Sequence, residues 1–192
     1  MRLQIFCFLF VAFGYSCSTK SVITKKGIPG KAEEVIEWTE SRRLQWNDYK
    51  GVPPDTSLQI AAVTNCGFGF SSRMRLIFNK PTISVSNTFN PGMSWVRDNQ
   101  TDRPGLLEHE QLHFDISEIY ARKLRIELAK AKLTYFNLKR KSEAIFQLVN
   151  REYLATQQLF EQQTDYSRNL IEQKKWRVKV DSELKSFGNY AN

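Results

Sequence analysis

Histidine and cysteine are both scarce in this sequence. Its 192 residues include two histidines and three cysteines, and its hydrophobic content is 41%. Three cysteines are too few for a domain stapled by several disulfides, so an apolar core must hold the fold, and the length suits one globular domain. Two histidines exclude a zinc site built from three histidines. Any zinc site in this chain therefore needs a ligand of another kind.

The one long and largely apolar run is too short to be a permanent membrane-spanning helix. It extends from Leu3 to Phe13, whereas a spanning helix needs about 20 apolar residues. Arg2 precedes the run and small residues follow it, which is the pattern of an export signal. Gly14-Tyr15-Ser16-Cys17 resembles a bacterial lipobox, with Gly14 in place of the usual Leu. We predict a lipoprotein-type signal peptide at 1–16 and lipidation at Cys17; cleavage nearby by an ordinary signal peptidase is the alternative.

This signal sets the expected location. A lipid on Cys17 would anchor the protein to a membrane of the cell envelope. The residues that follow, Ser-Thr-Lys-Ser, contain no acidic run of the kind associated with surface export. We therefore expect an exported, periplasm-facing lipoprotein. Cys66 would then have no partner for a disulfide, and we expect it to be a small buried hydrophobic residue in a strand.

The chain is basic, with a net charge of +8. Its Lys and Arg residues alternate with Glu in the stretches ARKLRIELAKAKL and IEQKKWRVKV, which is typical of a solvated helix face. Such a face would also favour anionic lipid. The sequence has no nucleic-acid recognition motif, so we expect no nucleic-acid partner.

The order of the expected elements indicates the fold class. Residues 17–35 are polar and contain glycine and proline, which predicts a flexible tether. Strand-like segments rich in Val, Ile, Thr and Phe then follow, and they read VIEWTESRRLQW, LQIAAVTNCGFGFSS, MRLIFN and TISVSNTF. From Thr101 onward the residues favour helices, at about 104–133, 139–162 and 167–185. Strands followed by helices predict one α+β domain at 36–192, with a small antiparallel sheet packed on the first helix.

That first helix carries both histidines. Thr101 or Asp102 is its expected cap and Pro104 is expected in its first turn. Positions i and i+4 share one face of a helix, so His109 and His113 can bind the same metal ion. With Glu110 they form the H-E-x-x-H pattern, in which the histidines bind zinc and the glutamate accepts a proton from the activated water. The pattern arises by chance in such a chain on the order of one time in a thousand.

Several blocks beyond this motif resemble one bacterial family, described as predicted secreted zinc-dependent proteases, a family of unknown function. They are LQWNDYKGVPP at 44–54, AAVTNCGFGF at 61–70, GLLEHEQLHFDISEIYARKLR at 105–125, and Gln173 with Trp176. The resemblance covers most of the chain after the signal. It implies a zincin-like fold, secretion, and catalytic roles for His109, Glu110 and His113.

The third zinc ligand is open. In the family, a Tyr-Asp, Thr and His block precedes the Gln and Trp, and its histidine would be the natural third ligand. Here Phe160-Glu161, Thr164 and Tyr166 stand in these places. Three candidates remain: the carboxylates of Glu161 and Asp165, and the phenol of Tyr166. The carboxylates are favoured because Asp and Glu are ionised at pH 7, whereas a phenol titrates near 10. A weak two-histidine site is the remaining alternative.

Other residues were weighed for supporting roles. Ligating histidines usually donate their second N–H to a carboxylate or carbonyl, so Asp115 or Glu118 could accept it; ordinary surface charges are the alternative. The tryptophans Trp46, Trp95 and Trp176 are expected to be packing residues.

Two functions follow from the sequence. The first is a zinc-dependent metalloendopeptidase in which Glu110 is the general base and an edge strand, within 61–70, pairs with an extended peptide or protein substrate. The second is a non-catalytic envelope lipoprotein with a degenerate zinc site, acting as a binding or scaffold module. Tyr166, which replaces the family histidine, is the feature that distinguishes the two.

Overall fold

The structure, a computed structural model, describes residues 35–55, 60–75 and 80–191. The chain divides into two units, Met1–Ala32 and Glu33–Asn192, and the described residues all belong to the second. The signal peptide, the lipidation site at Cys17 and nearly all of the tether lie outside the described residues. None of the helices in the described part is long and apolar enough to cross a membrane.

A small antiparallel sheet forms one layer of the fold, as expected. Its strand order is β1 (Ile36–Glu37), β4 (Lys80–Phe89) and β3 (Cys66–Arg75). The long strands β3 and β4 pair along their whole length, from Cys66 opposite Phe89 to Arg75 opposite Lys80. A second, two-stranded sheet joins β2 (Ala62–Val63) to β5 (Trp95–Val96).

The segment after Ile36 is mostly not a strand, which corrects our expectation for VIEWTESRRLQW. Only Ile36 and Glu37 form a strand; an isolated bridge joins Thr39 to Arg42, and a 3-10 helix follows at Trp46–Asp48. The residues between Thr39 and Arg43 are all exposed, so they offer no apolar side chains for a sheet face to bury. The indole of Trp38 instead donates a hydrogen bond of 2.8 Å to Asp115.

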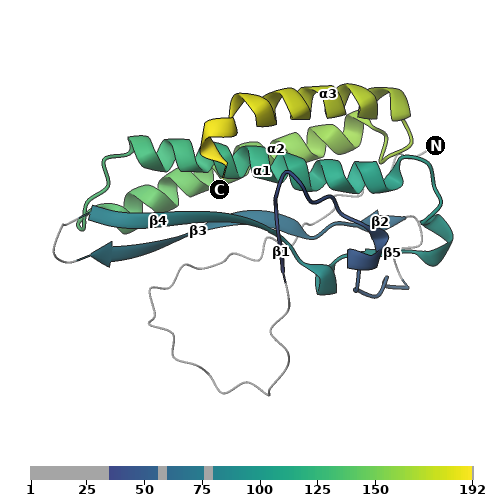
Figure 1. The fold of residues 1–192 in the computed structure, drawn as a ribbon, viewed down its shortest axis with the longest axis horizontal. Coiled ribbons are helices and arrows are strands. Elements are labelled where there is room, and N and C mark those ends of the chain that lie inside the picture. Colours follow the sequence, from purple (N-terminus) through teal and green to yellow (C-terminus); the bar gives the residue numbers. More distant parts are fainter. Residues whose placement is uncertain (1–34, 56–59, 76–79, 192) are drawn as a thin grey trace, which may run out of the picture. The chain divides into compact units, whose positions relative to one another are not determined.

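Three helices form the second layer, close to the predicted ranges: α1 (Leu106–Lys130), α2 (Leu138–Gln163) and α3 (Leu170–Ser186). α1 lies between the sheet and α3 (Figure 1), and it contacts β3, β4, α2 and α3. It is therefore buried along most of its length. The main core joins its apolar residues to those of the sheet and of α2 and α3, including Leu112, Ile116, Val85, Phe160 and Trp176.

The start of α1 differs from the sequence prediction. Its cap is Gly105, in a left-handed conformation with φ 78°, rather than Thr101 or Asp102, and Pro104 precedes the helix. A side chain at this position would be strained, and its Cβ would lie 2.5 Å from a methyl carbon of Leu170. The close approach of α3 to this turn therefore requires glycine.

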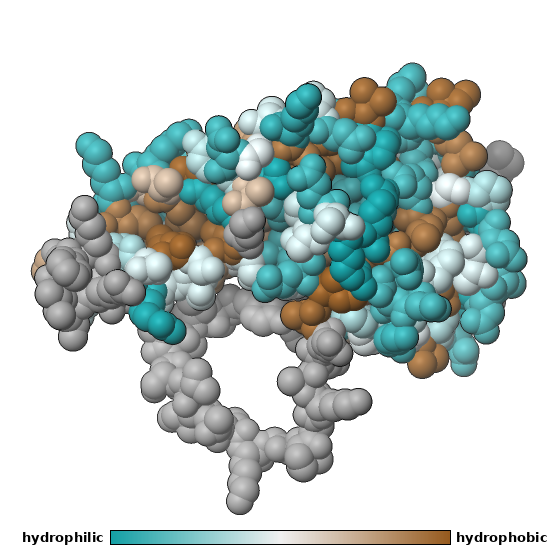
Figure 2. All heavy atoms as spheres, viewed as in Figure 1, coloured by the Kyte–Doolittle hydropathy of each residue, from teal (hydrophilic) through white to brown (hydrophobic). Residues whose placement is uncertain are grey.

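The surface is mixed rather than divided into charged and apolar faces. Figure 2 shows hydrophilic side chains over most of the visible face, with hydrophobic ones scattered between them. On α3, Lys174 and Lys175 are exposed beside Ile171 and Val178. Lys175 pairs with Glu172 at 2.6 Å, as expected for a solvated face with interleaved charges.

Candidate metal centre

His109 and His113 lie one turn apart in the N-terminal half of α1, and their Nε2 atoms point toward each other. Their Nε2 atoms are 3.2 Å apart. His109 is buried with 3% of its side chain exposed, and His113 has 14% exposed. The H-E-x-x-H spacing thus brings the two imidazoles together, as predicted.

The third group comes from the end of α2. Glu161 places Oε2 3.3 Å from Nε2 of His109 and Oε1 3.2 Å from Nε2 of His113. His109, His113 and Glu161 form the group of side chains that could hold a metal ion, with ligand atoms all within 4.8 Å of one another. Of the three candidates from the sequence, the structure therefore brings Glu161 to the histidines.

The distances between each histidine nitrogen and its neighbours are close to those around a small ion. With metal–ligand bonds of about 2.0–2.1 Å, two ligands of a tetrahedral zinc lie about 3.3–3.4 Å apart. The two Nε2 atoms are 3.2 Å apart. Nε2 of His113 is 3.2 Å from Oε1 of Glu161, and Nε2 of His109 is 3.3 Å from Oε2. Oε2 of Glu161 is buried and accepts no hydrogen bond. A cation at the centre of this group would satisfy it.

Gln157 determines which ring nitrogen of His113 carries the hydrogen. Its Nε2 donates to the backbone carbonyl of His113 at 2.9 Å, so its Oε1 faces the ring and lies 2.6 Å from Nδ1. Nδ1 must therefore donate, and a neutral His113 presents the lone pair of Nε2 to the carboxylate of Glu161. Two lone pairs at this distance repel unless a proton or a metal ion lies between them.

The charges within the cluster respond to this arrangement. Burial alone would lower the pKa of His113, but the hydrogen bond and the charge of Glu161 outweigh it and raise the pKa to about 9. Burial alone would raise the pKa of Glu161, but its interactions with His109 and His113 hold it well below the usual range. The carboxylate is thus ionised at neutral pH, as a metal ligand must be.

Aromatic residues form the inner wall of the cluster. The ring of Phe160 stacks on His109 with centroids 4.5 Å apart and an interplanar angle of 23°. It also meets His113 edge-on at 4.9 Å and Trp176 at 5.3 Å. The indole of Trp176 donates a hydrogen bond of 2.9 Å to Gln163 at the end of α2. These contacts hold the two imidazoles in place and exclude water behind them.

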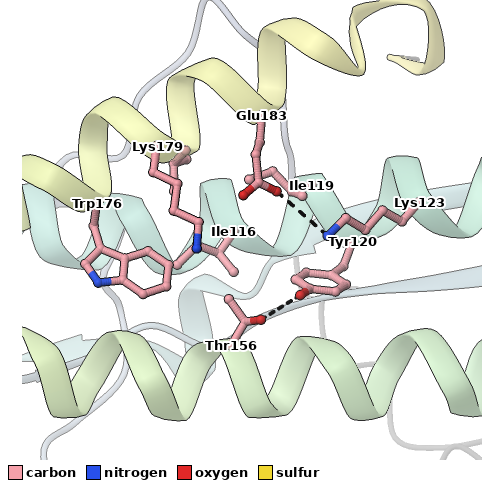
Figure 3. Close-up of a pocket in the computed structure, with 9 residues that line it drawn as sticks. Ile116, Ile119, Tyr120, Lys123, Thr156, Trp176, Lys179 and Glu183 are labelled. Atoms are coloured by element: carbon pink, nitrogen blue, oxygen red, sulfur yellow. Dashed lines mark hydrogen bonds and ion pairs between the residues drawn. The ribbon is translucent and has the colours of Figure 1, made fainter.

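Trp176 also lines a hollow of about 140 Å³ between the three helices. Figure 3 shows Lys179 over the indole of Trp176, the ion pair of Lys123 with Glu183, and the hydrogen bond between Tyr120 and Thr156. The residues that line this hollow do not include the histidines or Glu161. Trp176 thus separates the hollow from the metal cluster.

Glu110 is buried at the start of α1, with 4% of it exposed. Its charge acts on His113. It also acts on Tyr49 and Cys66: burial is the largest cause of their raised pKa values, and the charge of Glu110 raises them further. Among the described residues, none donates a hydrogen bond to its carboxylate. Its carboxylate therefore lies beside the cluster and accepts no hydrogen bond from a described side chain.

Cys66 begins β3 and is half-buried. Burial raises the pKa of its thiol to about 12, so it remains a thiol at neutral pH. It does not join the histidines in the metal-binding group found among the described residues. The sequence predicted a small buried hydrophobic residue in a strand; the strand position agrees, whereas the residue is half-buried rather than fully buried.

Asp165 and Tyr166 do not reach the cluster, which corrects their candidacy as ligands. α2 ends at Gln163, and the next residues after Thr164 take left-handed conformations, with φ 46° at Asp165 and 53° at Tyr166. The carboxylate of Asp165 pairs with Arg168 at 3.5 Å, and Tyr166 is 54% exposed. The turn therefore carries both side chains away from the histidines.

Asp115 and Glu118 form hydrogen bonds and ion pairs with residues other than the histidines. Asp115 accepts hydrogen bonds from Trp38, from Gln111 at 2.7 Å and from Arg177 at 2.7 Å. Glu118 is buried with Arg122 and Arg125. Asp115 thus ties α1 to the N-terminal segment and to α3.

The partner of His113 that sequence reasoning missed is Gln157. It lies four residues before Glu161 on α2, so both side chains share one helix face. This i, i+4 spacing is the sequence feature from which Gln157 could have been predicted to lie near the site. The expected packing roles of Trp95 and Trp176 are confirmed, since both are buried.

The chain was compared with family models, with curated proteins and with solved structures, and no significant match was found in any of the three.

Proposed function

We propose that this protein is a zinc-dependent metalloendopeptidase with a zincin-like fold. The observation that carries the proposal is the convergence of three side chains, with His109 and His113 on one helix and Glu161 on the next: the two Nε2 atoms are 3.2 Å apart and each faces one carboxylate oxygen of Glu161 at 3.2–3.3 Å. Two histidines and a glutamate are a ligand set of known catalytic zinc sites. The remaining tetrahedral position is left for water or substrate.

Zinc, when bound, would polarise a peptide carbonyl and make water nucleophilic at neutral pH. The role of Glu110 is to accept a proton at its carboxylate. It follows His109 directly on α1, is not a member of the ligand group, and receives no hydrogen bond from the described residues. A carboxylate that is buried beside the cluster yet unpaired is suited to proton transfer.

The substrate is proposed to be an extended peptide that pairs with β3. In the described sheet, β3 lies at one edge and pairs with β4 alone. α1, which carries the histidines, packs against this strand. The edge falls at 66–75, partly within the 61–70 stretch expected from the sequence, because Ala62 and Val63 pair with β5 instead. Main-chain hydrogen bonds along an edge strand bind peptides without strong sequence preference.

The location remains part of the proposal. A signal peptide at 1–16 and a lipid on Cys17 would anchor the domain to an envelope membrane, facing the periplasm. The basic surface of α3 is compatible with a nearby anionic lipid layer.

A non-catalytic binding or scaffold module is the second candidate. The observation that favours it is the 3.2 Å approach of Nε2 of His113 to Oε1 of Glu161, since a proton shared between these atoms could hold the cluster together without metal. Such a protein would keep its fold when zinc is removed and would cleave nothing.

The experiment that separates these functions is Glu110→Gln. The variant should retain zinc and fold, while losing about 10²- to 10⁴-fold in the rate of peptide cleavage, because the proton acceptor is gone. Glu152→Gln, an exposed site on α2, is the matched control and should cleave like the wild type. Zinc content and cleavage of a mixed peptide library are measured for all three. Stoichiometric zinc without cleavage by the wild type would establish the binding module instead, whereas equal cleavage by Glu110→Gln would overturn the role of Glu110 as the proton acceptor.

A further inference from the structure

His109 carries a buried ring nitrogen that no neighbour satisfies. Its Nδ1 is buried and has no hydrogen-bond partner, although its Nε2 faces Glu161 and His113. A neutral imidazole that binds a metal through Nε2 must carry its hydrogen on Nδ1. In the metal-bound state, Nδ1 of His109 is therefore a donor in need of an acceptor.

Gln173 carries a buried acceptor that no neighbour satisfies. It lies on α3 and is 4% exposed, and its Nε2 donates to the carbonyl oxygen of Gly105 at 2.8 Å. This bond fixes the orientation of the amide, because a carbonyl can only accept. The other end, Oε1, is buried and has no partner.

The two unsatisfied atoms belong to residues that donate hydrogen bonds to the same carbonyl, Gln173 through its side chain and His109 through its backbone N–H. The oxygen of Gly105 accepts from the amide of Gln173 and from the backbone N–H of His109 at 2.9 Å. The amide of Gln173 is thus fixed at the turn of α1 from which the His109 side chain projects. An unpaired buried donor and an unpaired buried acceptor each destabilise the fold, and pairing them removes both costs.

We propose that Gln173 is a positioning residue for His109: its Oε1 accepts the hydrogen of Nδ1 when a metal ion occupies Nε2. Gln173 then serves His109 as Gln157 serves His113, so each histidine has a glutamine partner from a different helix. The inference rests on the proposed metal binding, and it would explain why α3 approaches Gly105 so closely.

Arg177 offers a competing partner for Gln173. It lies one turn further along α3, and its Nε is also buried without a hydrogen bond. Its guanidinium is held by Asp115, at 2.7 Å, and by Asp181. If Gln173 served Arg177, its removal would affect stability but neither the hydrogen on His109 nor the affinity for zinc.

The test compares Gln173→Met, which keeps the length of the side chain but has no acceptor oxygen, with wild type. Zinc affinity is measured by competition with a chromophoric chelator, and the ring nitrogens of His109 are observed by ¹⁵N NMR in the zinc-loaded protein. Loss of such a supporting partner typically weakens metal binding by about 10- to 100-fold. We expect that loss, together with faster exchange of the Nδ1 hydrogen. Gln162→Met, an exposed site at the end of α2, is the control and should bind zinc like the wild type.

A second variant, Gln173→Glu, keeps an acceptor at the same position and decides the question if the first does not fold. Its ionised oxygen is a stronger acceptor, so the Nδ1 hydrogen of His109 should move downfield and zinc should bind at least as tightly as in wild type. An unchanged Nδ1 signal in Gln173→Glu, or unchanged zinc affinity in a folded Gln173→Met, would overturn the inference while leaving the metal centre intact. Failure of the wild type to bind zinc would overturn the metal centre and this inference together.

Discussion

The ring nitrogen Nε2 of His113 faces the carboxylate oxygen Oε1 of Glu161 at 3.2 Å, while the other ring nitrogen donates its hydrogen to Gln157. In a neutral histidine this arrangement would oppose two lone pairs. A cation is therefore required between α1 and α2, and it is either a proton or a metal ion. The nearby Nε2 of His109, 3.2 Å from that of His113, makes the place suitable for a metal ion with three ligands.

Glu161→Gln should weaken zinc binding strongly. The substitution keeps the size of the side chain but removes the negative charge that balances the metal. Residues one step removed from a metal cost about 10- to 100-fold in affinity when changed, so loss of a direct ligand should cost about 100-fold or more. Titration calorimetry on the purified protein measures this.

The controls for Glu161 are the two candidates that the structure places elsewhere, Asp165 and Tyr166. Asp165→Asn and Tyr166→Phe should bind zinc within error of the wild type, because both side chains are exposed and turned away from the histidines. Equal losses in Asp165→Asn and Glu161→Gln would mean that the turn after α2 rearranges to supply the ligand.

The metal-free protein should lose stability as the pH rises from about 6.5 to about 9. The pKa of His113 is raised from 6.5 to about 9 in the folded state, so its protonation stabilises the fold fully below pH 6.5 and not at all well above pH 9. The loss should amount to at most about 3 kcal/mol in the free energy of unfolding. The pKa of Glu161 is lowered, so its contribution is present above pH 4.5 and is lost as the pH falls below that value.

Urea unfolding with a chelator present, at pH 6, 8 and 10, measures this dependence. His113→Gln should abolish the fall between pH 6.5 and 9. With zinc present the trend should reverse, because the metal competes with the proton and binds more tightly as the pH rises. A stability of the chelator-treated protein that stays flat across this range would contradict a proton shared between His113 and Glu161.

Phe160→Ala should destabilise the domain and loosen the site together. Phe160 is fully buried and stacks on His109, so its truncation leaves a cavity at the cluster. Such substitutions cost about 3–5 kcal/mol in the free energy of unfolding. The neighbouring Leu159→Ala, at a site 43% exposed, should cost far less. Denaturant unfolding of both variants checks the difference, and comparable losses would place Phe160 outside the core of the site.

The sequence predicted the helices and the pairing of the two histidines because both depend on local spacing. The i, i+4 separation of His109 and His113 decides which face they share, whatever the helix packs against. The ends of α2 and α3 fell within three residues of the prediction for the same reason. The cap of α1 was not predicted, because Gly105 adopts a left-handed conformation at a turn packed against Leu170, which is distant in the sequence.

The third ligand could not be chosen from the sequence. Glu161 and Asp165 are four residues apart and would share a face if α2 continued, but the helix ends at Gln163. Where it ends depends on Thr164, which is fully buried and bonds back to the carbonyl of Phe160 at 2.7 Å. Tertiary packing thus excludes Asp165. The irregular path after Ile36 has a similar origin, since Trp38 is fixed by its hydrogen bond to Asp115.

The central claim is that His109, His113 and Glu161 bind one zinc ion, and X-ray absorption at the zinc edge tests it most directly. Protein loaded with one equivalent of zinc should show nitrogen and oxygen ligands at about 2.0–2.1 Å, including two imidazoles, and no sulfur at about 2.3 Å. In Glu161→Gln, any zinc retained should keep the two imidazoles while its oxygen shell changes. A sulfur ligand, fewer than two imidazoles, or failure of the wild type to retain zinc would contradict the account.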